Sequence, residues 1–356
     1  MASIDRHKLL QRAFFGCLFF SAVILSACLV QAKPSAVFAA MARFNLIFLL
    51  LALTTVLLSW ITEGLRVYLI ATALEEKVPL WPLIRINIAT AFSGNVVPIA
   101  SMAAPPTQVF LLHREGVPLG KATAIVAIRT AASTLFFTTC APLLLLSFGT
   151  RLVRQLIPNL AISLALQTVL LASTTVALLT LAILIRPELG ARLTNAAFSL
   201  RFVRRLLGTR SEQIVERVAR EAQEFHESMA CLFRRPGYAA VITFLTLVYW
   251  ALYFSVAPLL LLGVGFRLHF TGALRMMALL FLVYFLLSYL PIPTGSGVSE
   301  LSFGSLLLFF GIPDPIRTVI LVVWSFLCVQ IYTVLGGAFF LGSLRRRARP
   351  RDEITG

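Results

Sequence analysis

Long apolar stretches separated by short polar segments dominate the chain. Six of these stretches reach the roughly 20 residues that a helix needs to cross the hydrocarbon core of a bilayer. They fall at about 13–32, 44–64, 119–148, 160–185, 238–262 and 316–343. The pattern predicts an all-α fold, a polytopic membrane helix bundle with about six full spans.

Two further apolar regions are interrupted by residues that break helices. Residues 83–112 contain one glycine and three prolines, and residues 273–310 contain the segment PIPTGSG at 291–297. Proline lacks a backbone donor, and an unpaired backbone group is costly in lipid, so broken helices persist where protein or a water-filled cavity covers them. We therefore expect each region to form a re-entrant hairpin of two half-helices.

The two broken regions also resemble each other. Aligning Gly116 with Gly311 brings Pro118 onto Pro313, although shared composition alone would produce part of this similarity. If both termini face the cytoplasm, the two hairpins enter the membrane from opposite sides. Similar segments of opposite orientation indicate an inverted repeat, and matching interrupted helices indicate a site near the midplane.

The basic residues predict the orientation of the spans. The chain has 31 Lys and Arg residues against 15 Asp and Glu, a net charge of +16. With a cytoplasmic N-terminus, 23 of the basic residues lie in inside segments and seven in outside loops. Lys and Arg accumulate in cytoplasmic loops, so we expect both termini to be cytoplasmic. No aromatic-basic pattern accompanies the charge, and we expect no nucleic-acid binding.

We expect the whole chain, 1–356, to form a single integral-membrane domain. A helix starting near Thr209 and Glu212, which form a capping box, carries an apolar stripe on one side. It is expected to pack on the spans or lie at the lipid surface, and the alternative is a docking surface for a partner enzyme. The predicted parts are 13–185 (first spans and first hairpin), 186–237 (cytoplasmic amphipathic helices), 238–343 (later spans and second hairpin) and 344–356 (basic cytoplasmic tail).

The N-terminal segment has two interpretations. Residues 1–28 combine a charged start, an apolar run and LSAC ending at Cys28, which is the arrangement of a lipoprotein signal. The apolar run continues to Val30 and is long enough for a span, so we expect a retained first span with an unmodified Cys28. Processing at Cys28 is the alternative.

The sequence offers little for catalysis. Its five cysteines and four histidines show no metal-ligand spacing, and no nucleophile-base arrangement is apparent. It also lacks the GxxxxGK[ST] loop that holds nucleotide phosphates. We expect no metal, no cofactor and no enzymatic activity.

Ionisable residues inside apolar segments indicate functional positions. Glu63 and Arg66, three residues apart, are expected to form an interfacial ion pair. Arg129 lies eleven residues into its span, about 15 Å deep by the helical rise, and Glu300 follows PTGSG. We expect Glu300 to pair with Arg129, and the two to surround, with a half-helix N-terminus, a polar cavity for an anionic headgroup. The alternative is that Glu300 merely caps its helix.

Two segments carry a family resemblance. PTGSGVSE at 293–300, followed by GIP at 311–313, resembles a signature of the flippase-like membrane domain of the lysylphosphatidylglycerol synthase/flippase family and its stand-alone relatives. QVFLLHREGVPLGKATAIVAIR at 108–129 resembles the other signature of that family. The first break is usually glycine-rich in the family. Here it is MAAPPTQ at 102–108, which leaves Gln108 as its polar residue.

The resemblance implies a protein that moves a lipid headgroup between leaflets. Because the chain ends at Gly356 without an aminoacyl-transferase domain, the resemblance does not carry lipid aminoacylation over. We therefore expect a bacterial inner-membrane lipid translocator, acting on lipids with an anionic or modified headgroup. The alternative is a non-transporting membrane partner that presents lipid to an envelope glycosyl- or aminoacyl-transferase through 186–237. The expected substrate-binding residues are Gln108, Arg129, Gly295, Ser296, Gly297, Ser299 and Glu300.

Overall fold

The computed structural model describes residues 44–96, 100–156, 235–288 and 298–345, with a few single positions outside these ranges. Every regular element within these ranges is a helix. The predicted spans 13–32 and 160–185, most of the segment 186–237 and the tail lie outside the described residues. The helices are α3 (Leu46–Ala73), α4 (Leu80–Val96), α5 (Ala100–Arg114), α6 (Leu119–Leu156), α11 (Pro236–Gly263), α12 (Phe270–Ser288), α13 (Ser299–Phe309), α14 (Asp314–Ser325), the π-helix η3 (Phe326–Gln330) and α15 (Ile331–Arg345).

Four segments of the described chain are long and apolar enough to cross a membrane. They are Leu46–Ala73, Leu119–Ala141, Pro236–Gly263 and Asp314–Leu344. These coincide with four of the six predicted spans. The structure thereby confirms an all-helical membrane protein in the part of the chain that it describes.

The outward surface of α3 shows the lipid-facing pattern. Leu50, Leu57 and Ile61 are exposed, whereas Val56 and Val67 on the same helix are buried. Exposed large apolar side chains of this density are unfavourable in water and favourable against lipid tails. One side of the helix therefore faces lipid and the other faces the bundle.

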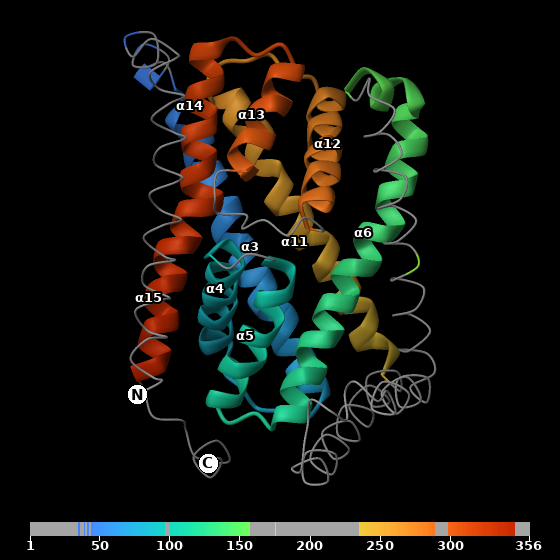
Figure 1. Cartoon of the computed structure of the whole chain (residues 1–356), viewed down its shortest axis with the longest axis vertical. Helices are drawn as coiled ribbons and strands as arrows, with labels where there is room; N and C mark the ends of the chain where they lie inside the picture. The colour runs from blue at the N-terminus through green and yellow to red at the C-terminus, as the bar shows by residue number, and fades with distance from the viewer. Residues whose placement is uncertain are drawn as a thin grey trace, which may run out of the picture.

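The helices on either side of the two predicted breaks are shorter than the four candidate spans. Helix α5 has 15 residues and α13 has 11, about 22 and 16 Å at the helical rise, against about 30 Å of hydrocarbon core. Figure 1 shows α4 and α5 in the lower half of the bundle and α12 and α13 in the upper half, beside the full-height α3, α6 and α11. The segments that join these helices, 97–99 and 289–297, lie outside the described residues, so the predicted re-entrant hairpins stay a prediction.

One detail of the first break differs from the expectation. Pro105 and Pro106 were predicted to interrupt the helix, but α5 continues through both of them. They lie in the second turn, so their missing donors leave only carbonyl groups near the start of the helix without a partner. The predicted interruption at Pro105 and Pro106 is therefore wrong, and so is the one at Gly94, because α4 continues through it to Val96.

The turns after α5 and α13 have the same backbone geometry. Gly116 has a φ of 96° and Gly311 a φ of 69°, a region that glycine enters without strain. In each turn the glycine N–H bonds the carbonyl three residues earlier, and the next N–H bonds the carbonyl five residues earlier. The turns that the sequence aligned thus end their helices in the same manner, as a Schellman motif does.

Helices α3 and α11 run antiparallel along each other, and each has 28 residues. At one end the Asn45 N–H donates to the Gly263 carbonyl over 2.7 Å. At the other end Arg235 Nη2 lies 3.3 Å from Glu75 Oε1. The start of each helix therefore meets the end of the other, and this pair forms the middle of the bundle (Figure 1).

Helix α15 packs closely on α4 through a glycine. A Cβ atom added at Gly336 would lie 2.4 Å from the Ile88 carbonyl oxygen and 2.6 Å from Phe92 Cβ, whereas one at Gly342 would meet nothing within 4 Å.

We predict that Gly336→Ala lowers the free energy of unfolding by about 1–3 kcal/mol, because the backbone must shift. Gly342→Ala, on the same helix, should be neutral or stabilising, since alanine favours helix. SDS titration in mixed micelles measures both, and equal stability of the two variants would contradict the packing.

Candidate functional site

Polar side chains form a layer between two apolar clusters in the bundle. The aromatic cluster includes Phe137, Trp250 and Phe281, and the aliphatic cluster includes Ile70 and Ile125. Three helices contribute to both clusters, and on each of them a polar residue lies where one cluster gives way to the other. These residues are Glu63 and Arg66 on α3, Arg129 on α6 and Thr246 on α11.

Glu63 holds two guanidinium groups with one oxygen. Its Oε1 accepts a hydrogen bond from Arg66 Nη2 at 3.0 Å and another from Arg129 Nε. Arg66 is fully buried, donates through Nη1 to Thr246 Oγ1 at 3.1 Å, and lies 5.6 Å from the centre of the Tyr249 ring. Charges this deep are tolerated when they are paired and hydrogen-bonded. The ion pair is therefore what allows three charged side chains inside the bundle.

Arg129 also anchors a relay of two amides. Its Nη1 donates to Gln108 Oε1 at 3.2 Å, and Gln108 Nε2 donates to Asn87 Oδ1 at 2.7 Å. Arginine has donors only, so it faces the oxygen of Gln108 and thereby sets the direction of both amides. The relay joins α6, α5 and α4 at the level of the ion pair.

A cavity of about 470 Å³ adjoins this polar layer. Its volume is in the range of small-molecule and cofactor sites. Side chains of α4 and α6 give it a wall of neutral hydrogen-bonding groups, together with Glu63 and Arg129. These neutral residues are Asn87, Thr90, Asn95, Thr130, Ser133 and Thr134.

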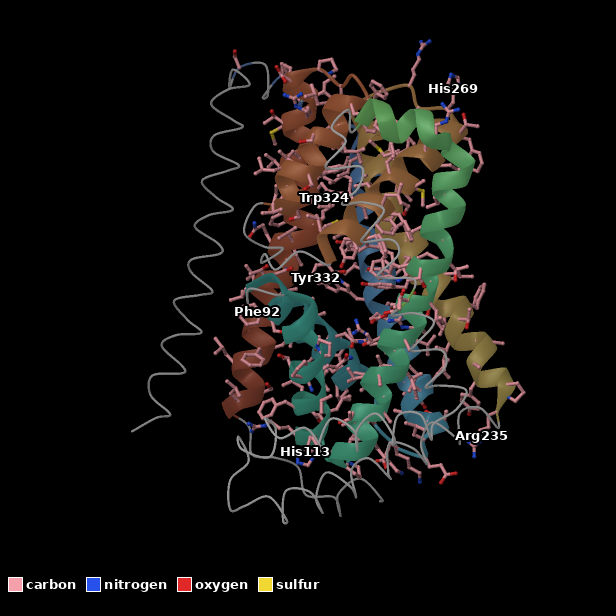
Figure 2. All side chains as sticks on the ribbon, turned by 45° about the vertical axis from the view of Figure 1, so that its right-hand side comes forward. Phe92, His113, Arg235, His269, Trp324 and Tyr332 are labelled. Atoms are coloured by element: carbon pink, nitrogen blue, oxygen red, sulfur yellow. The ribbon has the colours of Figure 1, made fainter. Side chains whose placement is uncertain are left out.

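The remaining lining of the cavity is aromatic. Figure 2 shows Trp324 and Tyr332, on α14 and α15, beside the middle and upper parts of the bundle. Many of these rings pack on each other, as Phe137 and Trp250 do with centroids 4.6 Å apart. Seven of the aromatic residues also carry an O–H or N–H group: Trp60, Tyr249, Trp250, Tyr253, Tyr284, Trp324 and Tyr332. The cavity thus has a hydrogen-bonding wall and an aromatic wall, a combination suited to an amphipathic molecule.

Glu300 lies beside the cavity, in the first turn of α13, and is fully buried. It accepts hydrogen bonds from Ser299 and Ser325, each at 2.8 Å. Ser299 lines the cavity, and Ser325 directly precedes the π-helix η3, whose Cys328 and Val329 also line it. Short π-helical segments are frequent at functional sites.

The predicted ion pair between Arg129 and Glu300 is wrong, because Arg129 has a different partner. Arg129 pairs with Glu63, which the sequence analysis assigned to a pair with Arg66 at the interface. The Glu63–Arg66 pair is confirmed, but it is buried in the bundle. The spacing of three residues identified Arg66 as a partner of Glu63. It does not show which other span lies beside this pair, and so it could not predict the contact with Arg129.

The remaining predicted site residues fall into two groups. Gln108 and Arg129 are hydrogen-bonded to each other, and Ser299 and Glu300 form a second pair. Arg129 and Ser299 line the same cavity, so both groups adjoin it. Gly295, Ser296 and Gly297 lie outside the described residues.

Asn87 and the aromatic wall were not predicted from the sequence. Asn87 is an amide in a strongly apolar stretch, and an intramembrane polar residue is a usable signal. The aromatic wall draws heavily on YWALYF at 249–254, which reads as ordinary core when the fold is unknown. In the described part of the chain, no three His, Cys, Asp or Glu side chains gather as metal ligands would.

Comparisons with known proteins give one matching family and one similar protein. The family described as "Lysylphosphatidylglycerol synthase TM region" matches residues 14–336. A "UPF0104 membrane protein" of Archaeoglobus fulgidus is 22% identical over 315 residues, which cover 88% of this chain and 92% of that protein.

We predict that Glu63 holds the polar layer together. Glu63→Gln leaves two guanidinium groups without their carboxylate and should cost about 3–5 kcal/mol of stability. The matched control is Glu76→Gln, whose carboxylate pairs with the partly exposed Lys121 at 2.7 Å and should cost about 1 kcal/mol or less. Both are measured by SDS titration in mixed micelles.

A double-mutant cycle isolates the Glu63–Arg129 interaction. The Glu63→Gln/Arg129→Gln protein should recover part of the loss, with a coupling energy of about 0.5–3 kcal/mol. Purely additive effects of the two substitutions would show that the ion pair does not stabilise the fold.

Proposed function

Because the chain belongs to the family of the lysylphosphatidylglycerol synthase transmembrane region, we propose that it is a flippase-like lipid translocator of the bacterial inner membrane. The observation that carries the proposal is the cavity, which places a guanidinium and several neutral polar groups inside an otherwise apolar bundle. A polar headgroup in hydrocarbon loses its hydration, and that cost is large unless protein groups replace the water. A cavity that supplies such groups lowers the barrier to moving a headgroup between leaflets.

We propose that the two broken regions are re-entrant hairpins related by an inverted repeat. The series α3, α4, α5, α6 has its counterpart in α11, α12, α13, α14, in which α3 and α11 have equal length and run antiparallel. The shared turn geometry at Gly116 and Gly311 supports the same correspondence. In transporters with inverted repeats, substrate sites lie near the midplane between the repeats. The cavity is lined by residues of both series, which supports this correspondence.

We assign the headgroup contacts to the two groups of polar residues that adjoin the cavity. Arg129, held by Glu63 and Gln108, would pair with the phosphate, since guanidinium matches its oxygens. Ser299 and Glu300 at the start of α13 would contribute from the other side, together with Gly295, Ser296 and Gly297 that precede them. In this role the protein needs no catalytic group, metal or cofactor, and its partners are membrane lipids.

We predict that lipid transfer depends on Arg129 and Glu300. Purified protein reconstituted in liposomes with labelled phospholipids should exchange lipid between leaflets, whereas Arg129→Gln and Glu300→Gln should reduce the rate at least about tenfold, a loss of roughly 1.4 kcal/mol of barrier lowering. Arg275→Gln, at an exposed position on α12, and Glu76→Gln are the matched controls and should exchange at the wild-type rate.

Two outcomes decide against this proposal. Wild-type exchange in monodisperse Arg129→Gln and Glu300→Gln proteins would remove these residues from the function. A wild-type protein that moves no lipid alone but co-purifies with an envelope glycosyl- or aminoacyl-transferase would favour the non-transporting partner instead.

We further propose that both termini and the loop containing residue 210 are cytoplasmic. His113 and His269 lie at opposite ends of the bundle, and both are exposed (Figure 2). In a cysteine-free background, His269→Cys should react with a membrane-impermeant maleimide in intact cells. His113→Cys should react only after permeabilisation, because the charge asymmetry places its turn inside. The reverse pattern would overturn the orientation.

A further inference from the structure

The two carboxylates of the turn between α3 and α4 are both paired. Glu75 Oε1 lies 3.3 Å from Nη2 of Arg235, directly before α11, and Glu76 Oε1 lies 2.7 Å from Nζ of Lys121 on α6. The Lys121 ammonium also donates to the Leu74 carbonyl at 3.0 Å, at the end of α3. The acidic groups of this turn are therefore committed to α6 and α11, on one side of the bundle.

Two cations on the α4 side of the same turn have no such partner. Lys77 directly follows the two glutamates and is exposed, and Arg85, in the second turn of α4, is partly exposed. Neither side chain forms an ion pair with any residue of the described chain. Lys and Arg near a membrane surface attract anionic headgroups, so these two positive charges are available to a lipid.

An exposed tryptophan lies between these cations in the sequence. Trp81 is 61% exposed, and it stands four residues after Lys77 and four residues before Arg85. Helical residues four apart share a face, so Trp81 and Arg85 are neighbours on the surface of α4. Tryptophan is enriched at the headgroup level of membranes, where its ring meets apolar groups and its N–H meets polar ones. This face of α4 therefore suits the headgroup region of a leaflet.

The same face of α4 leads to a surface suited to acyl chains. Ile88 and Phe92 continue the face at helical spacing and lie against Gly336 of α15. Figure 1 shows the start of α4 and the end of α15 at the same end of the bundle. Near this contact α15 exposes Val334 and Leu335, as lipid-facing helices do. A phosphate bound at the start of α4 thus has apolar surface close by, which a lipid would use and a soluble anion would not.

We propose that Lys77, Trp81 and Arg85 form a second lipid site, the α4 surface site, which binds the phosphate of an anionic phospholipid. The two cations bind the phosphate oxygens, Trp81 covers the glycerol backbone, and the acyl chains lie along α15. None of the three residues lines the cavity. The α4 surface site therefore holds a lipid of the leaflet at this end of the bundle, predicted to be cytoplasmic, whether or not the cavity moves lipid.

Quenching of Trp81 fluorescence by brominated lipids tests this site, because bromine quenches an indole that it contacts. The protein is placed in phosphatidylcholine nanodiscs that contain either brominated phosphatidylglycerol, which is anionic, or brominated phosphatidylcholine, which has no net charge. The difference between wild type and Trp81→Phe separates Trp81 from the cavity tryptophans Trp60, Trp250 and Trp324. We expect phosphatidylglycerol to be preferred beside Trp81 by at least about tenfold, because two basic groups attract it.

Two charge-matched variants locate the preference, each measured against its own Trp81→Phe reference. Lys77→Gln/Arg85→Gln should lower it to about twofold or less, with unchanged quenching by brominated phosphatidylcholine, which shows that Trp81 still contacts lipid. Lys121→Gln/Arg235→Gln removes the same charge from the same end, but from paired cations, and should keep the preference within about twofold of wild type. An equal loss in both variants would indicate diffuse surface attraction alone and would overturn the site.

Two further outcomes would also overturn the α4 surface site. One is the absence of Trp81 quenching by either brominated lipid. The other is relief of quenching by inorganic phosphate beyond that by chloride at equal ionic strength, which would assign the site to a soluble anion.

The α4 surface site and the proposed function are tested separately. Arg129→Gln should keep the preference beside Trp81, and its loss would assign the quenching lipid to the cavity and overturn a second site. A preference in nanodiscs without lipid exchange in liposomes would support the α4 surface site and refute translocation. Exchange that depends on Arg129, without a preference beside Trp81, would refute the α4 surface site and leave the translocator intact.

Discussion

The interior of this bundle depends on one carboxylate shared by two guanidinium groups. Glu63 joins Arg66 of its own helix to Arg129 of α6, and Arg66 continues the contact to Thr246 of α11. Three helices thereby meet at one level. A buried charge without a partner would cost several kcal/mol. Separating Glu63 from the two arginines is therefore strongly unfavourable. The apolar clusters on either side give the helices packing energy, whereas this layer specifies how they are aligned.

The shorter helices decide where a polar cavity can exist. Helices α4 and α5 lie in one half of the bundle and α12 and α13 in the other (Figure 1). Hydrogen-bonding groups of α4 and aromatic groups of α12 and α13 consequently face a shared space at the level of the ion pair. Full-length helices in these places would pack side chains where the cavity now lies. The proposed inverted repeat would bring these two similar stretches of sequence to the cavity from opposite sides.

Close backbone contacts fix the frame around that space. Gly336 allows α15 to approach the carbonyl of Ile88, and Gly64 allows Ile84 of α4 to approach α3. A methyl group would not fit at either position without a shift of its neighbours. The helix α4, which carries Asn87 and Asn95 into the cavity wall, is therefore clamped on two sides.

The sequence by itself determined the class of fold and most of its described helices. Apolar length predicted the four described spans, because this signal is local. Polar residues in apolar stretches identified Arg129 and Glu300 as positions of interest, and the family resemblance added Gln108. Their common cavity was anticipated only as a hypothesis.

Only the tertiary structure decided the partners. Arg129 pairs with Glu63, 66 residues away, and Glu300 accepts from Ser325 on α14, because the helices are brought together by packing that no local pattern encodes. The aromatic wall was hidden for the same reason. Tyr249 and Trp250 have the composition of an ordinary core until the fold places Arg129 and Asn87 across from them. Local patterns specify helices, whereas the chemistry of a cavity depends on which helix faces become neighbours.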